Sequence, residues 1–253
     1  MVTERRILLG MNKFMQELYL KSLDIKKGEI PKDDYICNLP VIKNFKNMEF
    51  KKPVTIFVGE NGMGKSTLIE AIATKWGFNA EGGSRHFNFM TRQTESDLNK
   101  YIKMIKGPYM PRDGYFLRSE SFYNMASYID DVGVIIKAYG GKSLHDQSHG
   151  ESFLSIFFKR FKGKGLYILD EPEAALSPIS QMSLLIRINQ LVNLNSQFII
   201  ATHSPILLAI PNAQIFEIDE SGIYERQYFE TGHYETMKNF FENTDKVVNS
   251  LIG

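Results

Sequence analysis

The chain of 253 residues contains a single cysteine, Cys37, and its formal net charge is only +1. One cysteine excludes a disulfide framework within the chain and fits a reducing cytosol, so we expect a cytoplasmic protein. We expect Cys37 itself to be a small buried apolar residue. The near-neutral charge gives no overall drive toward nucleic acid or an acidic membrane, although it is compatible with a local basic patch.

Long apolar runs are also missing. The longest apolar stretches have the length of a strand, far below the roughly 20 residues that a bilayer requires. The apolar run after Arg5 and Arg6 is too short for the core of a signal peptide. We therefore expect no direct membrane insertion, and any role at a membrane would act through a partner protein.

Short apolar runs are present instead, and hydrophobic residues reach 43% of the chain, enough for a packed core. Runs bounded by polar residues or glycine lie at 54–58, 115–117, 166–169, 198–201 and 215–218. Because they are apolar on both faces, they are typical of strands in a sheet that helices cover on each side.

Helical spacing separates these runs. Three sets of apolar residues each predict one helix face: Leu68, Ile69, Ile72 and Trp76; Phe153, Leu154, Phe157, Phe158 and Phe161; and Met182, Leu185, Ile188 and Val192. Ser177 followed by Pro178 predicts an N-cap with proline at the first helical position. Alternation of strands and helices predicts a mostly parallel, three-layer α/β core.

The expected organisation is one domain over residues 1–253. A small β subdomain spans approximately 12–53, with strand-like stretches at 19–25 and 39–42. The α/β core takes 54–78 and 163–220. A variable, partly helical part covers 79–162, and a C-terminal extension covers 221–253.

A phosphate-binding loop follows the first core strand. Residues 59–67 match the pattern G-x-x-x-x-G-K-[ST] between a predicted strand and a predicted helix. Glycines let backbone N–H groups approach phosphate oxygens, and the helix N-terminus favours negative charge. The residues expected to bind ATP here are Asn61, Gly62, Met63, Gly64, Lys65, Ser66 and Thr67, with Lys65 on the β- and γ-phosphates and Ser66 on Mg²⁺.

Two acids and a histidine end two other predicted strands. Asp170 and Glu171 follow the run at 166–169, and His203 follows the run at 198–201. Because the carboxyl ends of parallel strands face the ligand, we expect Asp170 to hold Mg²⁺, directly or through water. Glu171 is predicted to act as the general base on the attacking water, and His203 to contact the γ-phosphate and hold Glu171 in place.

One further segment completes a family pattern. Residues 147–151 read Gln-Ser-His-Gly-Glu before a predicted helix, and residues 174–177 read Ala-Ala-Leu-Ser after Glu171. With the phosphate loop, the acid pair and His203, this order resembles the ABC ATPase family. The signature Leu-Ser-Gly-Gly-Gln maps onto 147–151, where Ser148 and Gly150 are kept. The resemblance implies a P-loop NTPase fold of the ABC type and a head-to-tail dimer of two copies. In such a dimer, Ser148 and Gly150 of one chain contact the ATP of the other.

Within that superfamily, the run at 148–152 and the run at 170–178 look closer to stand-alone bacterial predicted ATPases on the RecF and SMC side than to transporter subunits. The family also carries a glutamine that senses Mg²⁺. Gln93 and Glu120 are the candidates, and we favour Glu120 as a metal ligand because it follows a strand-like run. Tyr35 and Phe45 are candidates for the aromatic residue that stacks on adenine.

Four functions agree with these motifs. The one we favour is an ATPase that dimerises around ATP and drives an unidentified protein partner. The alternatives are the energy subunit of a membrane transporter, a DNA-associated ATPase of repair or phage defence, and a module that binds ATP without turnover. The three groups Asp170, Glu171 and His203 argue against the last of these. The near-neutral charge gives no direct support to a nucleic-acid partner.

Overall fold

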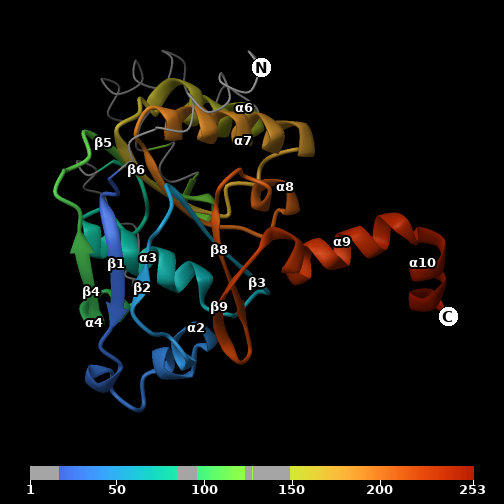
Figure 1. Ribbon diagram of the computed structural model, residues 1–253, viewed down its shortest axis with the longest axis horizontal. Helices are drawn as coiled ribbons and strands as arrows, with labels where there is room; N and C mark the ends of the chain where they lie inside the picture. The colour runs from blue at the N-terminus through green and yellow to red at the C-terminus, as the bar shows by residue number, and fades with distance from the viewer. Residues whose placement is uncertain (1–16, 85–95, 123–126, 128–148) are drawn as a thin grey trace, which may run out of the picture.

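The computed structural model describes residues 17–84, 96–122, 127 and 149–253, which form two sheets with helices packed around them (Figure 1). The larger sheet has six strands in the order β5-β6-β7-β3-β8-β9. Their bounds are β3 Val54–Gly59, β5 Asp113–Arg118, β6 Gly165–Asp170, β7 Gln197–Ala201, β8 Gln214–Asp219 and β9 Gly222–Arg226. The strands β5, β6, β7, β3 and β8 are parallel to one another, whereas β9 is antiparallel to β8.

The central strands explain why the apolar runs are continuous. Every residue of β3, β6 and β7 is buried. Alternate residues feed two separate cores, because successive side chains of a strand point to opposite faces. Phe57 and Ile168 pack with the first core, and Ile56 and Leu169 pack with the second. The predicted α/β fold with a mostly parallel sheet is therefore confirmed.

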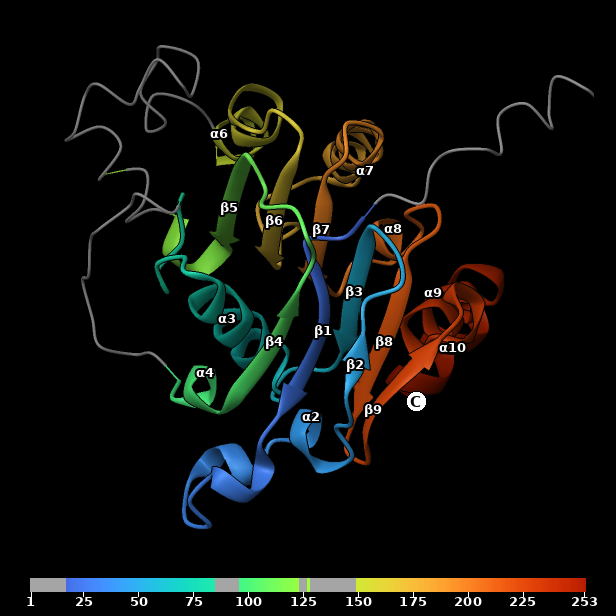
Figure 2. The ribbon, with the colours of Figure 1, turned by 60° about the vertical axis from the view of Figure 1, so that its left-hand side comes forward.

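Helices cover both faces of this sheet (Figure 2). The first core contains α3 (Lys65–Trp76), and the second contains α6 (His149–Ser155) and α7 (Pro178–Asn193). A π-helical turn, η5 (Ile156–Arg160), continues α6. The shorter helices are α2 Pro40–Lys43, α4 Leu98–Tyr101 and α8 Pro205–Leu208, with single turns η1 Lys27–Glu29, η2 Tyr35–Asn38, η3 Ser119–Ser121 and η6 Tyr228–Glu230.

The smaller sheet is antiparallel and has the order β2-β1-β4, from β1 Leu20–Ile25, β2 Met48–Glu49 and β4 Ile102–Lys106. Leu20, Leu23 and Ile102 from this sheet belong to the same core as α3. Helix α3, which follows the phosphate loop, therefore packs on both sheets. Strand β4 was not expected from the sequence and comes from the range predicted to be variable and partly helical.

Three details of the sequence prediction were wrong. Residues 39–42 were expected to be a strand, but Pro40 starts the short helix α2, where a proline fits the first position. The buried face of α7 is Leu184, Ile188 and Leu191, so Met182 of the predicted face is exposed. Cys37 is only half-buried rather than fully buried.

Two of the predicted helix faces agree well with the structure. Leu68, Ile69 and Ile72 of α3 are fully buried, and Phe153 and Phe157 are buried on the helix that starts at His149. Phe158 is the exception, because it lies on the solvent side of the π-helical turn and is 47% exposed. The predicted N-cap is also confirmed, since the Ser177 side chain accepts a hydrogen bond from the backbone N–H of Ser180.

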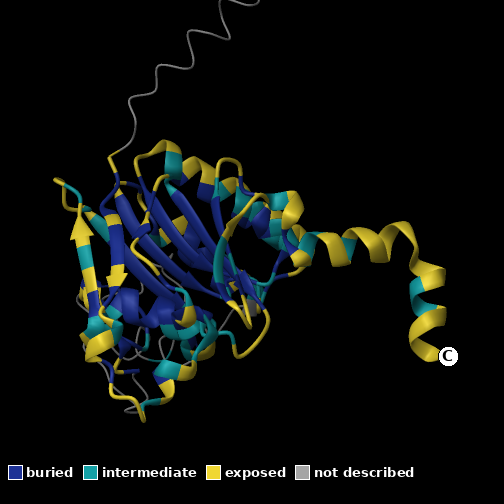
Figure 3. Ribbon diagram, turned by 60° about the horizontal axis from the view of Figure 1, so that its bottom comes forward, coloured by how far each residue is buried: buried dark blue, intermediate teal, exposed yellow. Residues whose placement is uncertain are grey.

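The C-terminal segment leaves the body of the molecule. Helices α9 (Gly232–Glu242) and α10 (Thr244–Ile252) form an arm that projects beside β8 and β9 (Figure 1). The arm is mostly exposed, in contrast to the buried sheet (Figure 3). None of the helices in the described ranges combines the length and the apolar character needed to cross a bilayer.

Candidate nucleotide site

Three parallel strands bring the predicted residues to one edge of the sheet. Strand β3 leads into the phosphate loop, β6 ends at Asp170, and β7 leads to His203 two residues after its end. Strand β7 pairs with both β3 and β6. The carboxyl ends of parallel strands meet at the same edge, which is where ligands bind in open α/β sheets.

Positive backbone angles shape the phosphate loop. Gly62 and Gly64 have φ of +81° and +92°, a region that residues with a Cβ atom avoid. Gly64 is also the N-cap residue of α3, and a Cβ atom there would lie 2.7 Å from the Val41 side chain. The backbone N–H of Val41 donates to the carbonyl of Met63 at 3.2 Å. Helix α2 thus holds the loop from outside.

Lys65 lies inside this loop. Its side-chain Nζ donates to the carbonyl of Glu60 at 2.8 Å, and the residue is only 4% exposed. Burial lowers the pKa of Lys65, and the carboxylates of Glu171 and Asp170 partly offset that effect. The ammonium group is therefore held within the ring of backbone that the motif assigns to phosphate.

Ser66 and Asp170 form the expected pair. The Ser66 hydroxyl donates to Asp170 Oδ1 at 3.0 Å, across 104 positions of sequence. Asp170 is almost fully buried, which raises its pKa to about 7, against the opposing effects of Arg118 and Ser66. When burial raises the pKa of a carboxylate in this way, a bound cation would stabilise its ionised form.

The donor set fits Mg²⁺ bound together with a nucleotide. A hydroxyl and a carboxylate are hard oxygen donors, and Mg²⁺ usually takes only one or two protein ligands beside phosphate and water. No group of three or more His, Cys, Asp or Glu residues is arranged to hold a metal within the described part of the chain. A Mg²⁺ ion bound together with a nucleotide takes its remaining ligands from phosphate and water.

Glu171 has an unusual backbone. Its φ is +50°, although it is not a glycine. Two hydrogen bonds hold this conformation: its N–H donates to the Ala201 carbonyl at 2.9 Å, and its own carbonyl accepts from Ser119 Oγ at 2.5 Å. Such strain persists only where the surroundings enforce it, and it is common at functional sites. It turns the chain sharply after Asp170, and the Glu171 side chain is 37% exposed.

His203 faces Glu171. Its Nε2 lies 3.5 Å from Glu171 Oε1, close enough for an ion pair if the ring is protonated. Burial and the nearby Lys65 lower the pKa of His203. Its backbone N–H donates to Glu173 Oε1 at 2.6 Å, which fixes the turn after β7. The ring is therefore mainly neutral near pH 7 and can exchange a proton with a neighbouring group.

Several residues of this site were missed by sequence reasoning. Glu173, Ser119 and Arg118 contact the turn after β7, the Glu171 carbonyl and the Asp170 carboxylate, respectively. Burial raises the pKa of Glu173. The pairing of β5 with β6 places Arg118 opposite Asp170, so recognising those two strands as neighbours would have identified it.

The remaining predicted residues lie in different surroundings. Asn61 and Gly62 are exposed at the tip of the loop, whereas Met63 and Thr67 are half-buried. Glu120 is 78% exposed and forms an ion pair with Arg118 at 3.2 Å. Its assignment as a metal ligand stays a prediction.

The signature is described only in part. Gly150 lies in the first turn of α6, where a Cβ atom would be 3.2 Å from the Ala175 carbonyl. The start of α6 thus packs against the segment 174–177. Ser148 and Gln93 lie outside the described residues. Of the two aromatic candidates, Tyr35 is exposed on η2, whereas Phe45 is buried in the core.

A cavity of about 510 Å³ adjoins the loop. Glu60 and Met63 of the phosphate loop line one side, and residues of α9, including His233 and Met237, line the other. The rings of His203 and His233 are 5.7 Å apart. The C-terminal arm therefore begins at the wall of the candidate nucleotide site.

Comparisons with known proteins agree with this geometry. Residues 35–131 match the family model of an AAA domain. Residues 152–209 match a second one, described as "AAA domain, putative AbiEii toxin, Type IV TA system". The first match contains the phosphate loop, and the second contains Asp170, Glu171 and His203. Among curated proteins no significant match was found.

Solved structures of similar shape include cbiO1 from Clostridium perfringens, part of the ABC transporter complex cbiONQ, at 17% identity and a TM-score of 0.48, covering 93% of this chain and 99% of that one. The SMC head domain from Thermotoga maritima has 16% identity and a TM-score of 0.44, covering 83% of this chain and 99% of that one. The SMC head bound to the C-winged helix domain of ScpA has 15% identity and a TM-score of 0.48, covering 82% and 97%. The two AAA-domain matches, each over less than half of the chain, support the resemblance to P-loop ATPases that the motifs carry.

Proposed function

We propose that the chain binds ATP with Mg²⁺ at the phosphate loop and hydrolyses it. The observation that carries the proposal is the convergence of Lys65, the Ser66–Asp170 pair and the Glu171–His203 pair at the ends of three neighbouring parallel strands. This set supplies a cation for phosphate, oxygens for a metal and a base for water, which are the parts that phosphoryl transfer to water requires.

Each residue has a separate task in the proposed reaction. Lys65 leaves the Glu60 carbonyl and neutralises charge on the β- and γ-phosphates. Mg²⁺, when bound, supplies further positive charge to the phosphate oxygens. Glu171 accepts the proton of the attacking water. Its strained backbone turns the chain, so that Glu171 lies just beyond the buried Asp170. His203 keeps the Glu171 carboxylate in place and contacts the γ-phosphate.

A head-to-tail dimer is the second part of the proposal. The tip of the phosphate loop, Asn61 and Gly62, is exposed, and the resemblance assigns the cover of the γ-phosphate to Ser148 and Gly150 of another copy. Within one copy, Gly150 lies close to the Ala175 carbonyl, so the start of α6 lies beside the segment that follows Glu171. The contact between copies is isologous, so two nucleotides are bound between the two copies, and ATP binding drives dimerisation.

The proposed output is work on a protein partner. The model matched by residues 152–209 names a toxin of a type IV TA system, and this favours a defence-type ATPase over the energy subunit of a transporter. A growth assay in a bacterial host separates these roles. Induced expression arrests growth if the chain acts as a toxin, and Lys65→Ala removes the arrest. Growth that is unaffected by the parental chain would remove the support for the toxin role.

Two measurements test the ATPase and the dimer. Purified chain should release phosphate from ATP only with Mg²⁺, and the absence of release under all metal conditions would contradict the enzyme proposal. For assembly, we expect Glu171→Gln to be monomeric without nucleotide and dimeric with Mg·ATP in light scattering coupled to size exclusion. Adding Ser148→Arg should abolish the dimer while monomers still bind ATP. A monomer at saturating ATP, or a dimer that survives Ser148→Arg, would contradict the head-to-tail arrangement.

A further inference from the structure

Arg118 is the last residue of β5, and its guanidinium lies among three carboxylates. Nη1 pairs with Glu70 Oε2 at 2.5 Å, Nη2 with Glu120 Oε2 at 3.2 Å, and Nε lies 3.9 Å from Asp170 Oδ2. Glu70 comes from α3, one turn after Ser66. One side chain therefore links the helix of the phosphate loop with the strand that ends at Asp170.

The contact with Asp170 is incomplete. At 3.9 Å it is an ion pair but not a hydrogen bond, and the Nε atom is buried without a hydrogen-bond partner among the described residues. Asp170 uses its other oxygen, Oδ1, to accept from Ser66. A shift of about 1 Å would turn the Nε contact into a hydrogen bond of ordinary length.

Glu70 anchors the arginine firmly. The Glu70 side chain is only 6% exposed, and its second oxygen, Oε1, accepts from the backbone N–H of Ser96 at 2.9 Å. A planar guanidinium that is held at one nitrogen has a defined orientation at the others. Nε is consequently fixed toward Oδ2 rather than free to follow the carboxylate.

We propose that Arg118 is a positioning residue for the Mg²⁺ site: it holds Asp170 through Oδ2, so that Oδ1 faces Ser66 and the metal. The inference rests on the proposed function, since it concerns the metal of that site. Arg118 carries the same sign of charge as the metal, so it acts through the Asp170 carboxylate and not as a ligand. Partners that orient a ligating carboxylate typically change metal affinity by about 10–100-fold.

The experiment measures Mn²⁺ as a stand-in for Mg²⁺. Electron paramagnetic resonance measures the concentration of free Mn²⁺ in the presence of a non-hydrolysable ATP analogue. Calorimetry measures the affinity for the nucleotide without metal. The test variant is Arg118→Met with Glu70→Met, because removing Glu70 together with Arg118 avoids leaving the buried Glu70 carboxylate without its partner. We expect Mn²⁺ affinity to fall by about 10–100-fold while metal-free nucleotide affinity is unchanged.

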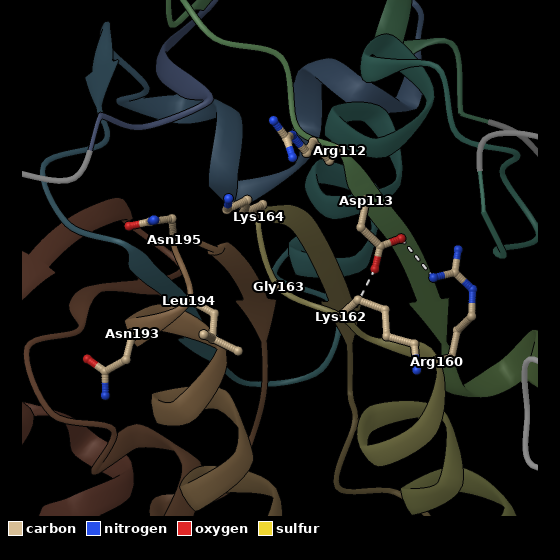
Figure 4. A pocket seen from close by; sticks show the side chains of 9 residues that line it. All are labelled: Arg112, Asp113, Arg160, Lys162, Gly163, Lys164, Asn193, Leu194 and Asn195. Atoms are coloured by element: carbon tan, nitrogen blue, oxygen red, sulfur yellow. Dashed lines mark hydrogen bonds and ion pairs between the residues drawn. The ribbon is translucent and has the colours of Figure 1, made fainter.

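A matched pair at the opposite end of the sheet provides the control. Arg160 pairs with Asp113 at 2.7 Å and is exposed to a similar degree as Arg118, 20% against 18% (Figure 4). Arg160→Met with Asp113→Asn should leave Mn²⁺ affinity at the parental value. An equal loss of affinity in this control would mean that any lost buried pair weakens the site, and it would overturn the specific role of Arg118.

Further variants separate the possible failures. If Ser66→Ala and Asp170→Asn do not weaken Mn²⁺ binding, the metal site itself is misassigned and the proposed function fails. If they weaken it and the double variant does not, only the role of Arg118 is overturned. Should the double variant not fold, Arg118→Lys decides, because it keeps the charge without the planar fork. Parental Mn²⁺ affinity in Arg118→Lys would overturn the proposal, and a loss of affinity would support it.

Discussion

The two ends of the six-stranded sheet both carry partly buried charge, but they satisfy it differently. At the amino ends of β5 and β6, Asp113 accepts from Tyr167 Oη at 2.8 Å and from the Lys162 N–H at 3.2 Å, and it pairs with Arg160 (Figure 4). At the carboxyl ends, buried atoms of Arg118, Glu173 and His203 have no hydrogen-bond partner among the described residues.

This difference distinguishes charged groups that stabilise the fold from charged groups that are candidates for binding a ligand. A saturated carboxylate such as Asp113 stabilises the fold, whereas unpaired buried polar atoms are costly, and those of Glu173 and His203 lie where a bound ligand could pair with them. The basic residues around Asp113 have a structural explanation of their own. Arg160 and Lys162 lie at the end of the helix formed by α6 and η5, where partial negative charge on the carbonyls favours cations. The cavity of about 480 Å³ at this end, which Asp113, Arg160 and Lys162 line (Figure 4), therefore does not imply a second site.

The largest expected effect is on turnover. Glu171→Gln should slow ATP hydrolysis by roughly 10²–10⁴-fold, the usual range for a lost general base, while ATP still binds. Steady-state phosphate release gives the rate, and calorimetry gives the affinity. A parental rate in this variant would place the base elsewhere.

The second effect is a dependence of stability on pH. Burial raises the folded-state pKa of Asp170 to about 7, above its value of 3.8 in an unfolded chain. Its contribution to stability is therefore fully present below about pH 4 and is lost as the pH rises through about 7, an effect of at most roughly 4 kcal/mol. Without metal, Asp170→Asn should exceed the parental chain in free energy of unfolding at pH 8 but not at pH 4. Urea unfolding in a chelator checks this, and equal differences at the two pH values would contradict it.

Lys65→Ala should weaken ATP binding next. Loss of a hydrogen bond from a charged group costs about 1.5–3 kcal/mol, which corresponds to about 10–150-fold in affinity. Lys164→Ala, at the opposite end of the sheet, is the control and should bind ATP as the parent does. Calorimetric titration measures both, and equal affinities would contradict the role of the phosphate loop.

The smallest expected effect concerns Asp113, at the amino ends of β5 and β6. Asp113→Asn should cost about 1–3 kcal/mol of stability, because it removes the carboxylate charge that pairs with Arg160, and it should not change the rate of ATP hydrolysis. Denaturant unfolding and phosphate release measure the two quantities. A slower rate at parental stability would show that the two ends of the sheet are coupled.

Much of the fold could be predicted because the central strands are buried on both faces and read as continuous apolar runs. Strand β4 was missed since Lys103 and Ile105 are exposed, so the stretch lacks such a run. The phase of α7 was wrong by one residue because Leu184 and Leu185 are both apolar, and the sequence does not say which one faces the core.

The residues of the candidate site also fall into those that the sequence predicted and those that it did not. Lys65, Asp170, Glu171 and His203 lie in local patterns at strand ends, so the sequence predicted that they meet. Arg118 has its partners at a distance of about 50 positions along the chain, in Glu70 and Asp170. No local pattern records such a pairing, and it becomes visible only once β5 is placed beside β6.

The C-terminal arm has a mechanical consequence. Its first turn lines the cavity next to the phosphate loop, and the rest extends outward from there (Figure 1). Helix α9 alone is about 16 Å long at 1.5 Å per residue. A tilt of about 10° at the cavity would therefore displace its far end by about 3 Å, and α10 would travel further. A small rearrangement around a phosphate group would thus produce a larger displacement at the tip of the arm.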